Sequence, residues 1–136
     1  MAGEAETTVQ TGDAPDRSLE TMLVDKVDGI MTITLNRPER LNAFTMQMVN
    51  DWFTILDEID SDADARAVIV TGAVRGFCAG ADLSSGARTF DSTNASKYSG
   101  ADSANEHRDE GGLLTRRTNR CRQPIIPALN GHAAGV

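Results

Sequence analysis

The hydrophobic and polar positions of this 136-residue chain first predict a β-hairpin and then a helix. Two extended segments, Leu19–Val27 and Ile30–Leu35, flank Asp28-Gly29, which is a strong signal for a tight hairpin turn. Apolar residues then recur at helical spacing from Thr45, a good N-cap residue, to about Ile59. The pattern therefore predicts two antiparallel strands followed by an amphipathic helix.

Two further apolar segments predict buried strands. Ala67–Thr71 is continuously apolar, which is typical of a strand in a sheet covered on both faces, and Pro124–Leu129 is a second such segment. Between them, Ser84–Asp109 is long and polar, as functional or mobile loops are, and Gly111–Cys121 predicts a short helix. The order β-β-α-β-loop-α-β predicts a layered α/β fold.

Composition narrows the class of protein. The net charge of −7 argues against nucleic-acid binding and against docking on anionic membranes, and no apolar run approaches the roughly 20 residues of a membrane span. Residues 1–18 are acidic and polar and lack the apolar core of a secretory signal, so we expect a disordered leader over 1–18 and one domain over 19–136. Cys78 and Cys121 form neither a disulfide framework nor a metal site. We therefore expect a protein that is not secreted and that is located in the cytoplasm or in an organelle matrix, with mitochondria and peroxisomes both among the candidates.

The candidate chemistry lies in two runs of small residues, each placed after an apolar segment. Arg75–Leu83 follows the strand predicted at Ala67–Thr71, and Asn130–Val136 follows the one at Pro124–Leu129. Small side chains let a ligand approach the main chain, and backbone N–H groups near a helix start are unpaired donors that favour negative charge. Such a run suits an oxyanion site built from backbone alone, with Asp82 favoured as a helix cap over a base.

Four segments together resemble the crotonase (enoyl-CoA hydratase/isomerase) superfamily. They are Leu35–Pro38 with Leu41–Ala43, then Ala67–Gly72, Phe77–Leu83 and Pro124–Gly131. The resemblance covers about residues 19–136 and corresponds to the N-terminal half of the family's domain. It implies a truncated spiral of β-β-α units that binds acyl-CoA thioesters, as a homotrimer or hexamer when full length. Coenzyme A would be part of the substrate, so neither a separate cofactor nor a metal is expected.

The resemblance also implies the site residues. The family stabilises a thioester enolate with two backbone N–H groups, which fall here on Ala81 and Val136. Fixed donors aimed at the developing charge act without reorganising, so the side chains at these two positions matter less than the main chain. The residues implied to contact substrate are Arg40, Leu41, Ala79, Gly80, Ala81, Asp82 and Leu83.

The reaction implied by the resemblance is the hydration of a 2-enoyl-CoA in the full-length form. In family hydratases two Glu residues supply the acid–base chemistry, and both of their positions fall beyond Val136. Relatives use the same oxyanion site for isomerisation, dehalogenation, decarboxylation and hydrolysis, so the reaction class stays open. The alternative is a catalytically incomplete fragment that acts only as an acyl-CoA-binding or oligomer-interaction module.

A basic group in and just after the second predicted helix allows two interpretations. Its members are Arg116, Arg117, Arg120 and Arg122. They could meet the phosphates of coenzyme A or a neighbouring subunit, or they could form an exposed helix face that offsets local acidic residues.

Overall fold

The computed structural model describes residues 17–84, 86 and 110–135, and its elements follow one another as β-β-α units. The first unit is β2 (Met22–Val27), β3 (Ile30–Leu35) and α1 (Met46–Ser61), and the second is β4 (Ala67–Gly72), β5 (Gly76–Cys78) and α2 (Glu110–Asn119). β6 (Ile125–Pro127) and β7 (His132–Ala133) follow, β1 (Arg17–Ser18) precedes them all, and a 3₁₀ helix, η1 (Pro38–Arg40), links β3 to α1. The predicted succession of β-β-α units is confirmed.

The strands form two sheets. The larger sheet has the order β1-β2-β3-β4-β6, with β2 antiparallel to β3 and with β3, β4 and β6 parallel. β5 and β7 pair in parallel as a second, two-stranded sheet. The β2–β3 hairpin turns at Asp28 and Gly29, whose φ angles are +50° and +78°, the left-handed conformation that such a turn requires.

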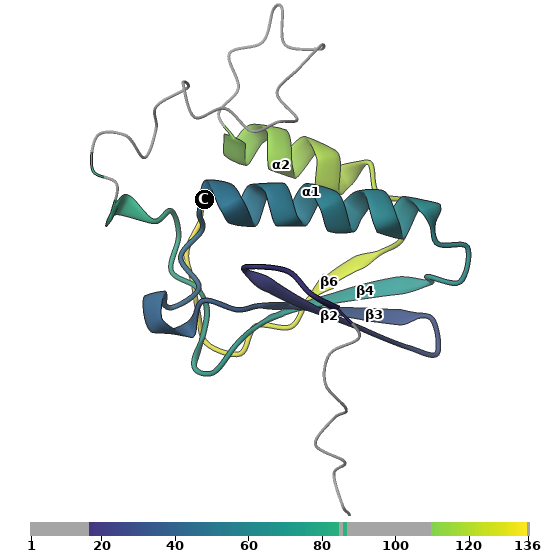
Figure 1. Ribbon diagram of the computed structural model, residues 1–136, viewed down its shortest axis with the longest axis horizontal. Coiled ribbons are helices and arrows are strands. Elements are labelled where there is room, and N and C mark those ends of the chain that lie inside the picture. The colour runs from purple at the N-terminus through teal and green to yellow at the C-terminus, as the bar shows by residue number, and fades with distance from the viewer. Residues whose placement is uncertain (1–16, 85, 87–109, 136) are drawn as a thin grey trace, which may run out of the picture.

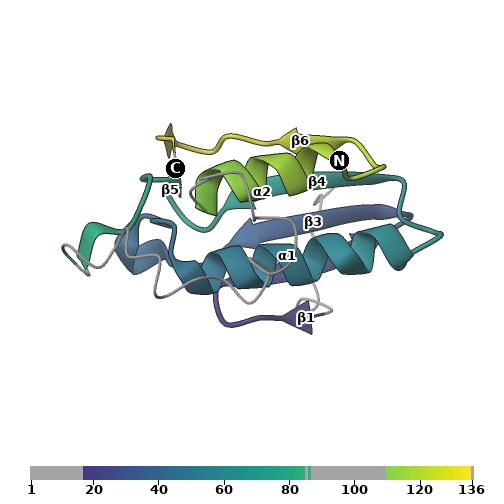
Figure 2. The ribbon, with the colours of Figure 1, turned by 90° about the horizontal axis from the view of Figure 1, so that it is seen from above.

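Both helices lie on the same face of the larger sheet, as Figures 1 and 2 show from two directions. Buried and partly exposed positions accordingly alternate along β3 and β4. The expectation that Ala67–Thr71 belongs to a sheet covered on both faces is therefore wrong for the described residues, because α1 and α2 cover only one face of it. The core between helices and sheet is formed mainly by Met22, Ile33, Leu35, Met48, Trp52, Ile55, Leu56, Ile59, Val68 and Val70.

Helix α1 begins where the sequence predicts. The Thr45 hydroxyl accepts a hydrogen bond from the Met48 N–H at 3.2 Å and so satisfies one of the free donors of the first turn. The helix continues through Ser61, two residues beyond the predicted end at Ile59. Burying each large apolar side chain of its inner face contributes roughly 1.5–3 kcal/mol, so this face fixes α1 on the sheet.

Three other expectations need correction. The strand predicted at Pro124–Leu129 is only three residues long, and Ile126 and Leu129 are 52% and 62% exposed, because β6 is the edge strand of the described sheet. β5 was expected as loop. Arg17 and Ser18 pair with β2, so regular structure begins no later than Arg17, inside the segment expected as a leader; residues 1–16 lie outside the described residues.

Candidate functional site

The Ala81 N–H is left free by the way that its neighbours pair with Phe44. The Phe44 N–H donates to the Gly80 carbonyl oxygen at 2.7 Å, and the Asp82 N–H donates to the Phe44 carbonyl oxygen at 2.9 Å. In such a parallel bridge the middle residue directs its own N–H and C=O away from the partner. Among the described residues, no hydrogen bond engages the Ala81 N–H. It is therefore available as a donor.

Gly80 brings the last described residues of the chain against this loop. Its φ of +92° strongly favours glycine, and a Cβ at Gly80 would lie 3.1 Å from the Gly135 carbonyl oxygen and 3.5 Å from the Ala134 Cβ. The Ala134 N–H also donates to the Cys78 carbonyl oxygen at 2.8 Å. Val136 lies outside the described residues, so its role as second donor stays a prediction. The two residues before it nevertheless lie next to Gly80.

Asp82 uses both carboxylate oxygens within the fold. Oδ1 accepts from the Ser84 N–H at 2.8 Å, and Oδ2 lies 3.0 Å from Nη2 of Arg37, with only 10% of the Asp82 side chain exposed. Hydrogen bonds from the Ser84 hydroxyl and N–H, together with the Arg37 guanidinium, lower the pKa of Asp82 from 3.8 to about 2. A carboxylate this acidic is a poor base near neutral pH. The geometry therefore favours Asp82 as a cap for the backbone that follows it over Asp82 as a catalytic base.

Asn42 holds the loop before α1 from inside the protein. Its side chain is fully buried; Oδ1 accepts from the Arg37 N–H at 2.8 Å, and Nδ2 donates to the carbonyl oxygens of Gly76 at 2.8 Å and Ala73 at 3.2 Å. The φ of Asn42 is +56°, a conformation that Asn tolerates better than most residues. Sequence reasoning used Asn42 only as part of a motif. The available signal was an Asn directly after a Pro-initiated turn.

Asn130 holds the neighbouring loop, residues 72–76, from the other side. Its Nδ2 donates to the Gly72 carbonyl oxygen at 2.8 Å, and its Oδ1 accepts from the Gly72 N–H at 3.0 Å. The packing is so close that a Cβ at Gly131 would lie 2.0 Å from the Arg75 carbonyl oxygen. Gly80 in the first small-residue run and Gly131 in the second thus lie where close backbone packing favours glycine.

An apolar cavity of about 280 Å³ lies beside the Ala81 loop, between the helices and the sheets. Its wall consists of Leu35, Phe44, Trp52, Val70, Phe77, Cys78, Leu114, Thr115, Thr118, Asn119 and Ala134. Phe44 pairs with Ala81, and Ala134 packs against Gly80, so the cavity adjoins the free N–H. Its volume lies just below the roughly 300–1,000 Å³ that is usual for ligand pockets.

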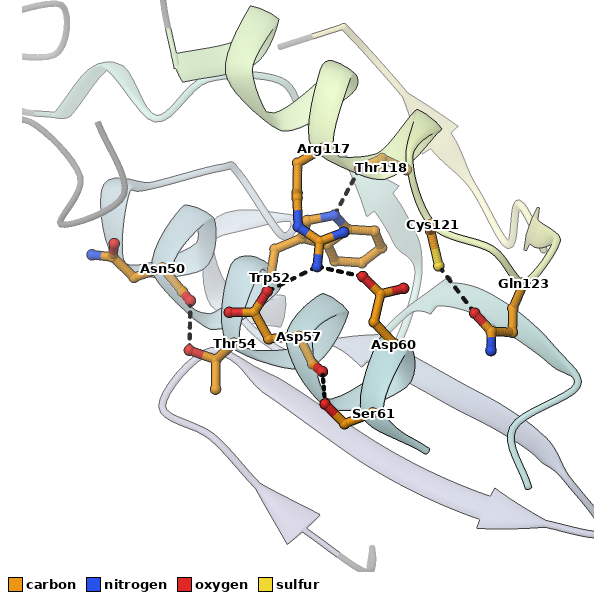
Figure 3. Close-up of polar contacts among 10 residues, drawn as sticks. All are labelled: Asn50, Trp52, Thr54, Asp57, Asp60, Ser61, Arg117, Thr118, Cys121 and Gln123. Atoms are coloured by element: carbon orange, nitrogen blue, oxygen red, sulfur yellow. Dashed lines mark hydrogen bonds and ion pairs between the residues drawn. The ribbon is translucent and has the colours of Figure 1, made fainter. Parts of the chain in front are cut away.

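Helix α2 forms one wall of this cavity and is fastened to α1 by polar contacts (Figure 3). The Trp52 indole N–H donates to Thr118 Oγ1 at 2.9 Å. Arg117 Nη2 lies 2.8 Å from a carboxylate oxygen of Asp57 and 2.8 Å from one of Asp60. Arg117 thus pairs with acidic side chains, as one of the two interpretations has it, but its side chain is only 21% exposed and joins α1 to α2 rather than lying on an exposed helix face.

The other residues expected to contact substrate lie around the same loop. Leu41 is 38% exposed, and its carbonyl oxygen accepts from the Ala79 N–H at 3.1 Å. Arg40 is exposed at the end of η1, and Leu83 is 63% exposed. The fold gathers these residues near Ala81, and their contact with substrate stays a prediction.

Two negative findings apply to the described part of the chain. Residues 17–84, 86 and 110–135 contain no group of three or more His, Cys, Asp or Glu side chains placed to hold a metal ion. Within the same ranges, neither α1 nor α2 has the length and apolar character needed to cross a membrane.

Comparison with known proteins shows the family. Residues 25–136 match the enoyl-CoA hydratase/isomerase family. The chain is 38% identical over 118 residues to a 1,2-epoxyphenylacetyl-CoA isomerase of Escherichia coli and 36% identical over 109 residues to an enoyl-CoA hydratase of Alternaria alternata. These matches cover 87% and 80% of this chain but only 43% and 33% of the two relatives, respectively.

The fold also matches a solved structure. An enoyl-CoA hydratase of Mycobacterium marinum superposes with a TM-score of 0.65 and 31% sequence identity, over 82% of this chain and 48% of that one. The chain thus spans less than half the length of the relatives compared here. It belongs to the enoyl-CoA hydratase/isomerase family of the crotonase superfamily.

Proposed function

We propose that this chain forms the acyl-CoA thioester site of an enoyl-CoA hydratase-type enzyme and stabilises a thioester enolate through backbone N–H groups. The observation that carries the proposal is the Ala81 N–H, which has no hydrogen-bond partner among the described residues and lies beside an apolar cavity. The second donor is the Val136 N–H. In the full-length protein the reaction is the hydration of a 2-enoyl-CoA.

The chemistry assigned to this site is the stabilisation of charge. When the oxygen of water bonds to C3 of the 2-enoyl thioester, one O–H bond of the water breaks and releases a proton, the C2–C3 π electrons move toward C2, and the thioester carbonyl oxygen becomes negative. A proton then adds to C2, and the electrons return from the oxygen. Donors already fixed in place at that oxygen stabilise the charged state more than the substrate, which is the condition for a faster reaction.

The cavity supports an apolar acyl group as the occupant. Its wall includes the aromatic rings of Phe44, Trp52 and Phe77, and few of its side chains are polar. Burying the acyl chain there places the thioester carbonyl near Ala81, because the cavity and the free N–H share Phe44 as a common neighbour.

Calorimetric titration of the 136-residue chain with acetoacetyl-CoA tests the proposal. Ala81→Pro removes the free N–H but neither bridge bond, since these use the Gly80 carbonyl and the Asp82 N–H. Ala81→Ser keeps the N–H and is the matched control. We expect saturable binding by the wild-type chain and the Ser variant, and binding at least about tenfold weaker by the Pro variant, as loss of one oxyanion donor costs roughly 10²–10³ in rate elsewhere.

Equal affinity of the Pro and Ser variants would overturn the assignment of Ala81. Absence of binding to the wild-type chain would overturn the proposal that this chain forms the site. A third outcome is that the 136-residue chain binds acyl-CoA but shows hydratase activity only when it is extended beyond residue 136. This outcome would assign the acyl-CoA-binding part of the function to the 136-residue chain. Absence of activity in that extended protein as well would favour the binding or oligomer-interaction module over an enzyme.

A further inference from the structure

We infer that Arg37 is a positioning residue for the oxyanion donor: its ion pair with Asp82 fixes the direction of the Ala81 N–H. This inference rests on the proposed function of Ala81. Arg37 itself need not touch the substrate, and no sequence motif singled it out for this role.

The Arg37 guanidinium connects the two chain segments that form the Phe44–Ala81 bridge. Its Nη1 donates to the Ala43 carbonyl oxygen at 2.6 Å, and its Nη2 lies 3.0 Å from Oδ2 of Asp82. Ala43 directly precedes Phe44, and Asp82 directly follows Ala81. One planar side chain with donors in a fixed fork therefore holds both sides of the Phe44–Ala81 bridge.

Arg37 is itself held in place. Its N–H donates to Oδ1 of the fully buried Asn42 at 2.8 Å, and its carbonyl oxygen accepts from the Asn42 N–H at 2.9 Å. Only 19% of the Arg37 side chain is exposed. Because both the backbone and the guanidinium of Arg37 are held by hydrogen bonds, the side chain can move little. The atoms that it contacts are then also restrained, as a preorganised N–H donor requires.

The state of Asp82 fits this role. Its Oδ1 is occupied by Ser84 and its Oδ2 by Arg37, and its side chain is mostly buried. Removing either partner of such a pair releases the residue that follows Ala81 and allows the Ala81 N–H to tilt. Misplacement of a catalytic group by about 1 Å can cost on the order of a hundredfold in rate.

The test separates enolate stabilisation from ligand binding. Acetoacetyl-CoA loses a C2 proton to the buffer, the C–H electron pair moves onto the carbonyl oxygens, and the enolate has its own ultraviolet absorbance. Butyryl-CoA gives no enolate under the same conditions. We would measure the enolate fraction of bound acetoacetyl-CoA and the affinity for butyryl-CoA in the wild-type chain, Arg37→Met, Asp82→Asn and the double variant.

The expected result is a fall of about tenfold to a hundredfold in the enolate-to-ketone ratio of the bound ligand in both single variants, with a clearly smaller fall in the affinity for butyryl-CoA, whose uncharged thioester oxygen depends less on the donor. The double variant should lose no more than either single variant, because the two residues act as one unit. If Arg37→Met does not fold, the isosteric Asp82→Asn decides the question.

Lys26→Met is the matched control, since it breaks another ion pair, Lys26–Asp62 at 2.6 Å, at the opposite end of α1. An unchanged enolate ratio in Arg37→Met and Asp82→Asn would overturn the inference while leaving the proposed function intact. An equal fall in Lys26→Met would also overturn it, because the effect would then be general. Absence of any acyl-CoA binding by the wild-type chain would instead overturn the proposed function, and the inference with it.

Discussion

Trp52 on α1 donates its indole N–H to the hydroxyl of Thr118 on α2. The bond joins two helices through residues that lie 66 positions apart in the sequence. Both residues line the apolar cavity. Trp52 is only 7% exposed, so its N–H has little access to water when the hydroxyl is removed. The bond therefore links the stability of α2 to the shape of the cavity.

Thr118→Val should destabilise the protein by roughly 1–3 kcal/mol, since it leaves the buried Trp52 N–H without an acceptor. Urea unfolding followed by tryptophan fluorescence measures this loss. Thr115→Val is the control, because among the described residues the Thr115 hydroxyl donates to the Gly111 carbonyl oxygen of its own helix and to no residue of α1. Equal losses in the two variants would show that the bond to Trp52 contributes nothing specific.

Asp82 should make the stability depend on pH in acid. Its pKa is lowered from 3.8 to about 2 in the folded protein, so its contribution is present above the unfolded pKa and is lost as the pH falls from about 5 toward 2. The difference in free energy of unfolding between wild type and Asp82→Asn should therefore shrink over that range. Denaturant titrations at a series of pH values measure it, and a constant difference would contradict the assignment.

Gly80→Ala should disturb the site as well as the stability. At a φ of +92° any side chain is strained, at a cost on the order of 1–3 kcal/mol, and the new Cβ would also press on the Gly135 carbonyl oxygen. Gly86→Ala is a control with a positive φ of +58° and no neighbour within 4 Å. We expect weaker acetoacetyl-CoA binding, measured by calorimetry, in the Gly80 variant only. Equal affinities would argue against packing of Gly135 on Gly80 in solution.

Asn42→Ala should cost roughly 2–5 kcal/mol, because it removes three hydrogen bonds and leaves buried backbone groups unpaired. Asn130→Ala should cost less, since Asn130 is more exposed to water that can replace its bonds. Unfolding in urea compares the two variants directly. A larger loss of stability in Asn130→Ala than in Asn42→Ala would mean that burial of the asparagine does not determine which variant is less stable.

Local signals in the sequence predicted those features of the fold that depend on a single short segment. The turn at Asp28-Gly29 and the cap at Thr45 both depend on residues within a few positions, and both are confirmed. β5 was missed because three residues, one of them glycine, carry no strand pattern. The exposure of β6 could not be read from its apolar residues, because burial depends on what packs against a strand.

For the candidate site, sequence reasoning found the loop but missed the residues that hold it. Gly80 and Ala81 lie in a recognisable run of small residues. The partner of Asp82, in contrast, is Arg37, which lies 45 positions earlier, and no local pattern links two residues so far apart. Hydrogen bonds such as those of Asn42 to Ala73 and Gly76 likewise become visible only once the chain has folded back on itself.

The Gly76 carbonyl oxygen accepts hydrogen bonds from two asparagines, Asn42 at 2.8 Å and Asn130 at 3.4 Å. One donor precedes Gly76 by 34 residues and the other follows it by 54 residues. During synthesis the ribosome releases Asn42 and Gly76 long before Asn130, so the first bond can form early while the second must wait. Completion of the loop at residues 72–76 is therefore a late event in folding, and it makes the arrival of the C-terminal segment the step that finishes the site.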